Sequence, residues 1–262
     1  MRQYFVIILL IFISSIEFGR TVKRDLTVTE KIIRYDLAGN TVPIRVLQFG
    51  NRKDIVLINL HDDEATSVDA AKRILQEQGG MLIEIENDAQ RNIRFRLGKY
   101  SYKVDPNRIF AKEGIQRSLE EFGRVSSRAV YEVEKLGQRI IQLIPADAQY
   151  VVALHNNTPG LFDAEEYSSG NKRAADTKKI YLNPEEDADD FFLTTDKTLY
   201  NNLADKGFNT ILQDNINCSE DGSLSVYCGK KNIRYVNCET EHGKVEQYYK
   251  MLEAFFTSIE QP

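Results

Sequence analysis

Apolar and polar positions in the first part of the chain predict three strands. Residues 27–35 and 42–49 alternate between apolar and polar with a period of two. The turn Ala38-Gly39-Asn40 lies between them, so the two segments are expected to pair. Residues 55–60 form an apolar run that only Asn59 interrupts. Such a run is typical of a central strand buried on both faces of a sheet.

The next segment predicts a strand–helix–strand unit. From Ser67 the apolar residues recur at helical spacing, and Gly79-Gly80 ends the pattern. The next strand is expected at 81–85 and completes the unit. The same rhythm continues along the chain. Strands are expected at 93–97, 100–104, 150–154, 191–193, 209–212 and 233–238, and helices at 115–122, 128–143, 197–206 and 244–259.

These elements predict a single α/β domain with a mixed, mostly parallel sheet flanked by helices. A chain of 262 residues can bury a substantial core as one domain, expected at 20–262. The polar stretch 156–190 interrupts the pattern and is either a lid or binding loop, or disordered. The net charge of -5 gives the chain no excess of positive charge with which to bind phosphates, so we expect no nucleic-acid partner.

The N-terminus has the character of a secretory signal peptide. Arg2 precedes ten uninterrupted apolar or aromatic residues, 4–13, and two serines follow. We predict a signal peptide at 1–19, with an uncleaved anchor as the alternative, and a secreted or periplasmic protein without stable membrane association after cleavage. Cys218 and Cys228 flank a turn-rich segment with Asp221-Gly222, which predicts a hairpin closed by a disulfide.

Candidate chemistry begins with the three histidines of the chain. His61 follows the strand at 55–60, Glu64 lies three residues later, and His155 follows the strand at 150–154. Neighbouring strand ends in an α/β sheet converge on one crevice, so these side chains are expected to meet. Two histidines and a glutamate form a ligand set that zinc hydrolases use, with an open position for water. Cobalt or nickel would accept the same ligands.

Two further polar motifs follow other predicted strands. Asn107 and Arg108 offer an amide and a planar fork for a carboxylate; the alternative is a turn and a structural salt bridge. Glu239 and Glu241 both follow the strand expected at 233–238. Either could act as general base or merely cap the last helix. His242 is expected to be an outer-sphere or solvated residue.

Three motifs together resemble the zinc-carboxypeptidase superfamily, in particular its aspartoacylase and succinylglutamate desuccinylase branch. They are His61-Asp62-Asp63-Glu64, then Asp105-Pro106-Asn107-Arg108-Ile109-Phe110, then Leu154-His155-Asn156-Asn157-Thr158. Glu239-Thr240 resembles the family's general-base motif. The likeness covers about 55–159 and 233–240. Pro106 departs from the family pattern, and 162–227 shows no correspondence.

The resemblance implies a role for each matched residue. His61, Glu64 and His155 would bind Zn²⁺, Asn107 and Arg108 would hold the substrate carboxylate, and Glu239 would activate water. The family also uses an arginine beside the scissile carbonyl. Arg94 and Arg96 share one face of the strand at 93–97, and we predict Arg96 for this role.

The leading hypothesis is therefore an exported zinc hydrolase that cleaves an amide bond next to a carboxylate. Its substrate would be a peptide or an N-acyl amino acid. The alternative is a secreted, non-catalytic ligand- or peptide-binding protein on the same fold. A serine hydrolase is disfavoured because the sequence contains no Gly-x-Ser-x-Gly elbow.

Overall fold

The computed structural model describes residues 26–260, so the predicted signal peptide at 1–19 lies outside the described residues. The strands are β1 Val28–Leu37, β2 Asn40–Phe49, β3 Ile55–Asn59, β4 Gly80–Ile85, β5 Ile93–Leu97, β6 Tyr100–Val104, β7 Tyr150–Asn157, β8 Thr177–Tyr181, β9 Phe191–Thr194, β10 Asn209–Gln213 and β11 Tyr235–Glu241. The α-helices are α1 Ala65–Gln78, α2 Lys112–Glu121, α3 Ser127–Ile141, α4 Lys197–Asp205, α5 Leu224–Lys230 and α6 Val245–Ile259.

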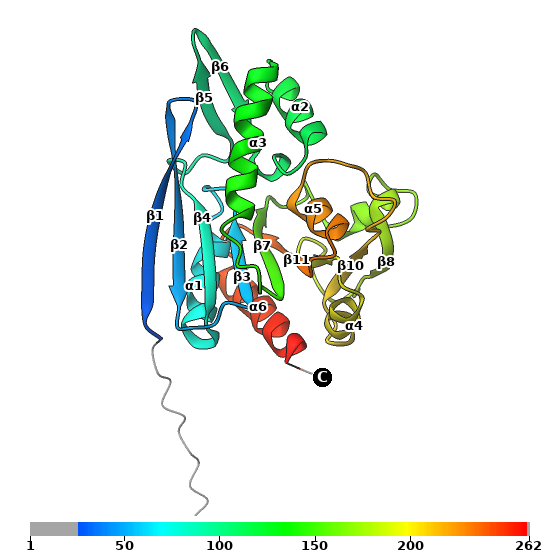
Figure 1. Cartoon of the computed structure of the whole chain (residues 1–262). Helices are drawn as coiled ribbons and strands as arrows, with labels where there is room; N and C mark the ends of the chain where they lie inside the picture. The colour runs from blue at the N-terminus through cyan, green and yellow to red at the C-terminus, as the bar shows by residue number, and fades with distance from the viewer. Residues whose placement is uncertain (1–25, 261–262) are drawn as a thin grey trace, which may run out of the picture.

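One mixed sheet organises the described chain. Nine strands lie in the order β1-β2-β4-β3-β7-β11-β9-β10-β8, and β5 and β6 form a separate hairpin (Figure 1). The four central strands β4, β3, β7 and β11 run parallel to one another. Their carboxyl ends therefore lie along the same edge of the sheet, where α/β proteins place their binding sites.

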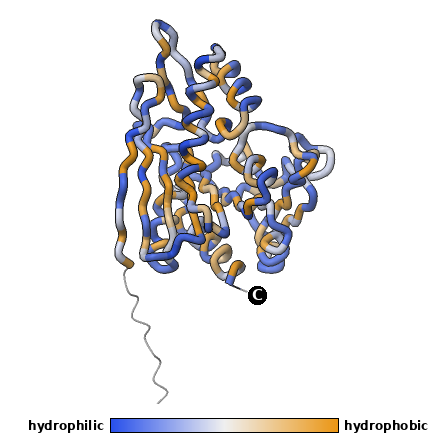
Figure 2. Tube along the Cα trace, in the orientation of Figure 1, coloured by the Kyte–Doolittle hydropathy of each residue, from blue (hydrophilic) through white to orange (hydrophobic). Residues whose placement is uncertain are grey.

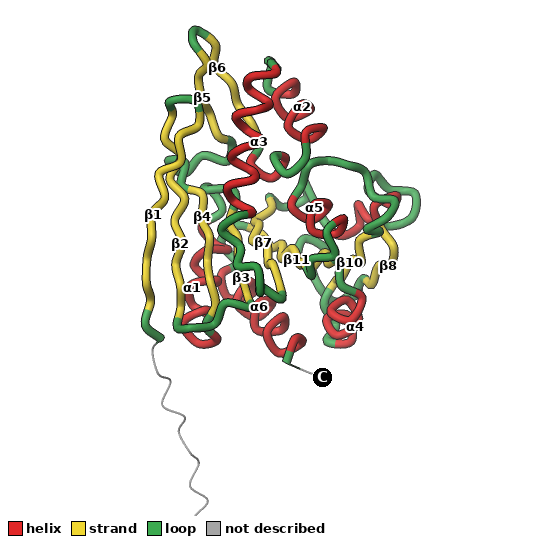
Figure 3. The backbone as a smooth tube through the Cα atoms, viewed as in Figure 1, coloured by secondary structure: helices red, strands yellow, loops and turns green. Residues whose placement is uncertain are grey.

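Helices cover both faces of this sheet (Figure 3). Side chains of α2, α3 and α5 share one apolar core with Val56 and Ile58 of β3, whereas those of α1, α4 and α6 share the other core with Ile55 and Leu57. Successive strand residues point to opposite faces, so a strand covered on both faces must be apolar throughout. Figure 2 shows apolar residues along the strands of the sheet. The predicted α/β fold with helices on both sides is thus confirmed.

The expected disulfide between Cys218 and Cys228 was wrong, because the hairpin on which it depended is absent from the described residues. Residues after Ser223 form the helix α5, and the Ser223 hydroxyl accepts a hydrogen bond from the backbone N–H of Val226 at 3.4 Å as its N-cap. Both cysteines, and Cys238, are buried free thiols. Burial raises the pKa of Cys228 to about 12.

Two other differences matter for the site. The strand β7 extends to Asn157, so His155 lies within the strand and not beyond its end. The polar stretch at 156–190 contains β8 and two short 3₁₀ helices, Ala164–Tyr167 and Ala174–Asp176.

Within residues 26–260, none of the helices has the length and apolar character needed to cross a bilayer.

Candidate metal centre

The turn between β3 and α1 places the first two candidate ligands. The backbone N–H of Glu64 donates to the carbonyl of His61 at 3.1 Å, which closes a tight turn directly before the helix. The hydroxyl of Ser67 donates to the carbonyl of Glu64 at 2.7 Å and fixes the first turn of α1. The register of β3 with β7 pairs Asn59 with Leu154, so His155 lies next to this turn.

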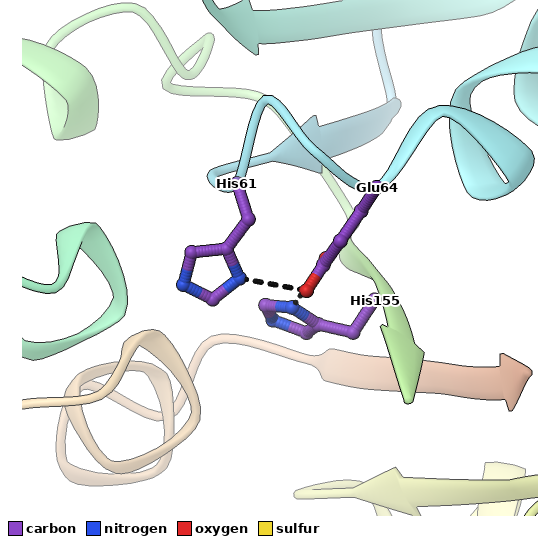
Figure 4. A group of neighbouring side chains, drawn as sticks. All are labelled: His61, Glu64 and His155. Atoms are coloured by element: carbon purple, nitrogen blue, oxygen red, sulfur yellow. Dashed lines mark hydrogen bonds and ion pairs between the residues drawn. The ribbon is translucent and has the colours of Figure 1, made fainter. Parts of the chain in front are cut away.

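The two histidines converge on the carboxylate between them (Figure 4). His61 Nδ1 lies 3.0 Å from Glu64 Oε1, and His155 Nδ1 lies 3.0 Å from Glu64 Oε2. Donor atoms of all three residues fall within 4.8 Å of one another. The side chains are buried, with residue exposures of 1% for His61 and Glu64 and 4% for His155. The structure thus brings together the three residues that the sequence singled out.

Electrostatics hold this cluster in its charged form. Burial favours the neutral form of His61, but the charges of Glu64 and Asp105 dominate and raise the His61 pKa to about 9. Burial would also raise the pKa of Glu64, yet the two histidines hold it well below its usual range. A proton on His61 would therefore have to leave before its Nδ1 could bind a cation.

Contacts behind the cluster orient both rings. His61 Nε2 lies 2.8 Å from Asp105 Oδ1, an arrangement that fixes the tautomer in which Nδ1 can bind a metal. The backbone N–H of His155 donates to the Tyr248 hydroxyl at 3.0 Å, and that hydroxyl donates to the carbonyl of Cys238 at 2.7 Å. The helix α6 therefore supports the strand position of His155.

Arg91 is the closest cation to the cluster, and the sequence reasoning missed it. Its Nη1 lies 2.5 Å from Glu64 Oε1, and its side chain remains 46% exposed. It belongs to the loop between β4 and β5, directly beyond the carboxyl end of a central strand. That position, an arginine in a loop after a buried strand, is the signal that could have found it.

The predicted carbonyl arginine, Arg96, lies outside this site. Arg94 and Arg96 project outward from β5 and line a separate surface cavity with Tyr102 and Lys103. The alternation of β5 explains this position, because Ile93 and Phe95 occupy the inward face. The structure thus places Arg91, rather than Arg96, beside the cluster.

The cluster opens onto a cavity of about 450 Å³. One wall carries the cluster, Arg91 and the segment from Asp105 to Arg108. A second part of the lining, here called the loop wall, comes from the polar stretch 156–190 and from the loop before α5. It includes Leu161, Phe162, Glu166, Tyr167, Lys172, Arg173 and Asp221.

Glu239 faces the cavity from β11, and Glu241 does not line it. The register of β11 with β7 pairs Glu239 with His155, so the two side chains are direct neighbours. Glu239 is 6% exposed and accepts a hydrogen bond from the Asn237 amide at 3.0 Å. Burial raises the pKa of Glu239, although nearby His155 opposes the shift. Of the two glutamates, the geometry favours Glu239 as a proton acceptor.

Asn107 and Arg108 lie on the cavity wall, anchored to the loop before α5. The side-chain oxygen of Asn107 accepts from the N–H of Leu224 at 3.1 Å, and Arg108 Nη1 lies 3.2 Å from Asp221 Oδ2. The backbone at Gly114 passes close to the backbone at Gly222. A Cβ on Gly114 would lie only 2.4 Å from the Cα of Gly222, so this contact requires glycine. The ion pair of Arg108 was one of the two alternatives expected from the sequence. It leaves the guanidinium 29% exposed at the cavity.

No family model matches this chain, and no curated protein matches it either. Solved structures similar to it include an aspartoacylase family protein from Mesorhizobium loti, with 11% identity and a TM-score of 0.44 over 90% of this chain and 67% of that one. Murein-tripeptide amidase MpaA from Escherichia coli O157 has 13% identity and a TM-score of 0.45 over 89% of this chain and 92% of that one. Thrombin activatable fibrinolysis inhibitor has 10% identity and a TM-score of 0.49 over 91% and 70%.

One of these structures is an aspartoacylase family protein, and the motifs of this chain resemble the aspartoacylase branch. The identities are at most 13% and the TM-scores are below 0.5 for all three. A function for this chain therefore has to be argued from its own residues.

Proposed function

We propose that this protein is a zinc-dependent hydrolase that cleaves an amide bond next to a carboxylate. The observation that carries the proposal is the buried convergence of His61, Glu64 and His155 at one cavity, with Glu239 as their neighbour. Two imidazole nitrogens and a carboxylate oxygen suit the borderline softness of Zn²⁺. The set supplies three ligands, which leaves one position of a tetrahedral ion for water or substrate.

The residues present fit a resident zinc ion. His61 Nδ1, His155 Nδ1 and the carboxylate of Glu64 would hold it, since all three already point at one position. Asp105 behind His61 supplies the outer hydrogen bond that metal-binding imidazoles usually make. When bound, zinc lowers the pKa of a coordinated water and polarises a carbonyl.

In the proposed mechanism, the residues of this chain move the proton and hold the substrate. Glu239 accepts a proton from the attacking water at its carboxylate and passes it to the nitrogen of the departing amine. Its burial and raised pKa suit a group that must gain and lose a proton near neutral pH. Arg91, next to Glu64, is the residue placed to orient the scissile carbonyl.

Arg108 and Asn107 define the substrate class in this proposal. A partly exposed guanidinium on the cavity wall suits the planar geometry of a carboxylate. Asp221 holds the guanidinium until a substrate carboxylate replaces or shares that contact. The proposed substrates are therefore peptides with a free C-terminus and N-acyl amino acids.

Export through the N-terminal segment is part of the proposal. The basic start and the apolar run at 4–13 support it. N-terminal sequencing of the protein recovered from its producing cells tests this point. A mature chain that starts near residue 20 fits export, and a chain that retains Met1 contradicts cleavage.

The decisive variant is Glu239→Gln, which keeps the shape of the side chain and removes the proton acceptor. We expect zinc content to stay at the wild-type level, while kcat falls about 10²- to 10⁴-fold, the usual contribution of a general base. Hydrolysis would be followed on a panel of peptides and N-acyl amino acids, each with its C-terminally amidated analogue. The amidated analogues should be poor substrates.

Glu241→Gln serves as the matched control, since it is two residues away on the same strand and does not line the cavity. We expect it to retain most of the activity. Wild-type protein that binds zinc and hydrolyses no member of the panel would support the non-catalytic binding alternative. An equal fall in kcat in Glu239→Gln and Glu241→Gln would contradict the assignment of Glu239 as the general base.

A further inference from the structure

A second group of carboxylates lies at the ends of the same strands, away from the cavity. Asp187 and Asp189 belong to the turn before β9, and Glu241 is the last residue of β11. One carboxylate oxygen from each lies within 4.8 Å of the other two. Calcium–oxygen distances of about 2.3–2.6 Å place the ligands of one ion within about 5 Å of each other. The spacing thus fits a single cation.

Two buried oxygens at this place have no hydrogen-bond donor among the described residues. They are Asp189 Oδ1 and Asn157 Oδ1, on residues that are 8% and 5% exposed. The Asn157 amide donates to the backbone carbonyl of Asp189 at 2.7 Å, so its side chain ends at the same turn. Buried acceptors are nearly always satisfied in folded proteins. Asp189 Oδ1 in the cluster thus lacks a positive partner, and Asn157, which also lines the cavity, has an amide oxygen free to supply a further ligand.

The charges of the cluster are also unbalanced. Lys244 Nζ lies 2.8 Å from Asp187 Oδ2, 2.9 Å from Glu241 Oε2 and 3.9 Å from Asp190 Oδ1. No cationic side chain within residues 26–260 forms an ion pair with Asp189. One ammonium group therefore pairs with three carboxylates, and the fourth, Asp189, has no ion pair among the described residues. Burial raises the pKa of Asp189 to about 6, and the adjacent Glu241 carboxyl adds to this shift.

We infer that Asp187, Asp189 and Glu241, with the amide oxygen of Asn157, form a site for a divalent calcium ion. All four donors are oxygens, which hard cations prefer, in contrast to the nitrogen-containing set around His61. Calcium accepts irregular geometry from several chain segments, whereas magnesium demands a near-ideal octahedron. Asp187 and Glu241 each contact Lys244 through one oxygen. The other oxygen of Asp187 accepts the backbone N–H of Asp189 at 3.1 Å, and its second lone pair would bind the ion.

This calcium site would connect three strand ends next to the candidate zinc centre. Asn157 lies two residues beyond His155 on β7, and Glu241 lies two residues beyond Glu239 on β11. Asp189 ends the long segment that supplies one wall of the cavity. A bound ion would fasten that wall to the strands. The predicted effect is on stability, and it does not depend on hydrolysis.

The test is the melting temperature of the full-length protein at constant free zinc while CaCl₂ is raised to about 5 mM. Extracellular calcium modules bind with dissociation constants of about 10⁻⁴–10⁻³ M. Binding of that strength should raise the melting temperature by about 2–8 °C. Magnesium at the same concentration should give a smaller rise. Zinc content, measured in parallel, should not change.

Asp189→Asn should abolish the response to calcium, and Glu241→Gln, on a less buried residue, provides a second test if the first variant does not fold. Glu186→Gln is the matched control, because it removes the same charge near the same turn from a residue outside the proposed ligand set. It should respond like the wild type. A wild-type melting temperature that does not respond to calcium would overturn the inference. A calcium response in Asp189→Asn and Glu241→Gln as large as that of the wild type would also overturn it.

Discussion

The two walls of the cavity are built in different ways. One wall consists of short segments at the carboxyl ends of β3, β4 and β7, and its three candidate metal ligands are buried and each contact at least two polar side chains. Arg91 on the same wall is 46% exposed and makes one ion pair. The other wall consists of the stretch between β7 and β9 together with the loop before α5. Its charged groups, Arg173 and Asp221, are 26% and 30% exposed and make single ion pairs with Glu166 and Arg108.

We expect the strand-end wall to carry the metal and the proton transfer, and the loop wall to select the substrate. Groups that must hold a metal and move a proton need fixed positions, and strand ends buried under helices provide them. Groups that select a substrate can lie on loops, where sequence changes are tolerated. We therefore expect substitutions on the strand-end wall to change kcat and metal content, and substitutions on the loop wall to change KM.

Arg108 lies where the two walls meet. Of the predictions that follow, its replacement is expected to have the largest effect, and that effect is on catalysis. We expect Arg108→Ala to lower kcat/KM for carboxylate substrates about 10- to 100-fold, since a charge-assisted hydrogen bond contributes about 1.5–3 kcal/mol. Zinc content should not change. Steady-state kinetics on a free-acid substrate and its amide would measure this, and the variant should discriminate less between the two.

Arg96→Ala is the matched control for that experiment. It removes the same side chain from the exposed face of β5, outside the cavity. Its kinetics should equal those of the wild type. If Arg96→Ala were impaired and Arg108→Ala were not, the division of the cavity into these two walls would be mistaken.

The strand-end wall also predicts a smaller effect, on the pH dependence of stability without metal. Glu64 and Asp105 raise the pKa of His61 to about 9 against the opposing effect of burial, whereas an unfolded histidine titrates near 6.5. The protonated form thus stabilises the metal-free fold fully below about pH 6.5, and this contribution is lost as the pH rises to about 9.

The melting temperature of the metal-free protein should therefore fall by a few degrees between pH 6.5 and 9. The pKa values of Glu64 and Asp105 are lowered, so their contributions are lost only at acidic pH, outside this window. Asp105→Asn should weaken the fall, since it removes one of the two carboxylates. A flat or rising melting temperature across the window would contradict the assigned charge state of His61.

The same contrast explains what the sequence could predict. Residues 55–60 and 150–154 are apolar because both faces of their strands are covered, so the strands and the polar residues after them were recognisable. Residues on loops carry no such pattern. Arg91 and Arg173 reach the cavity through the three-dimensional course of their loops. For Arg91 the only sequence signal is its place in a loop after a buried strand, and Arg173 has none.

The wrong disulfide has a local cause. Asp221-Gly222 between apolar residues is a signal for a hairpin, but Ser223 caps a helix instead. Four residues, 224–227, are too few to distinguish a strand from the first turn of a helix by periodicity. The structure places Arg96 outside the cavity for a related reason, because alternation identifies residues on one face of a strand but not which face meets the site.

The measurement that tests the central claim most directly is the metal content of the purified protein and of Glu64→Ala, by elemental analysis after dialysis against zinc. We expect about one zinc per wild-type chain, as for other sites with three protein ligands, and none tightly held by the variant. It also predicts that the variant keeps its helical and strand content in circular dichroism. A wild-type protein that holds no zinc, or a Glu64→Ala variant that holds as much as the wild type, would contradict the claim.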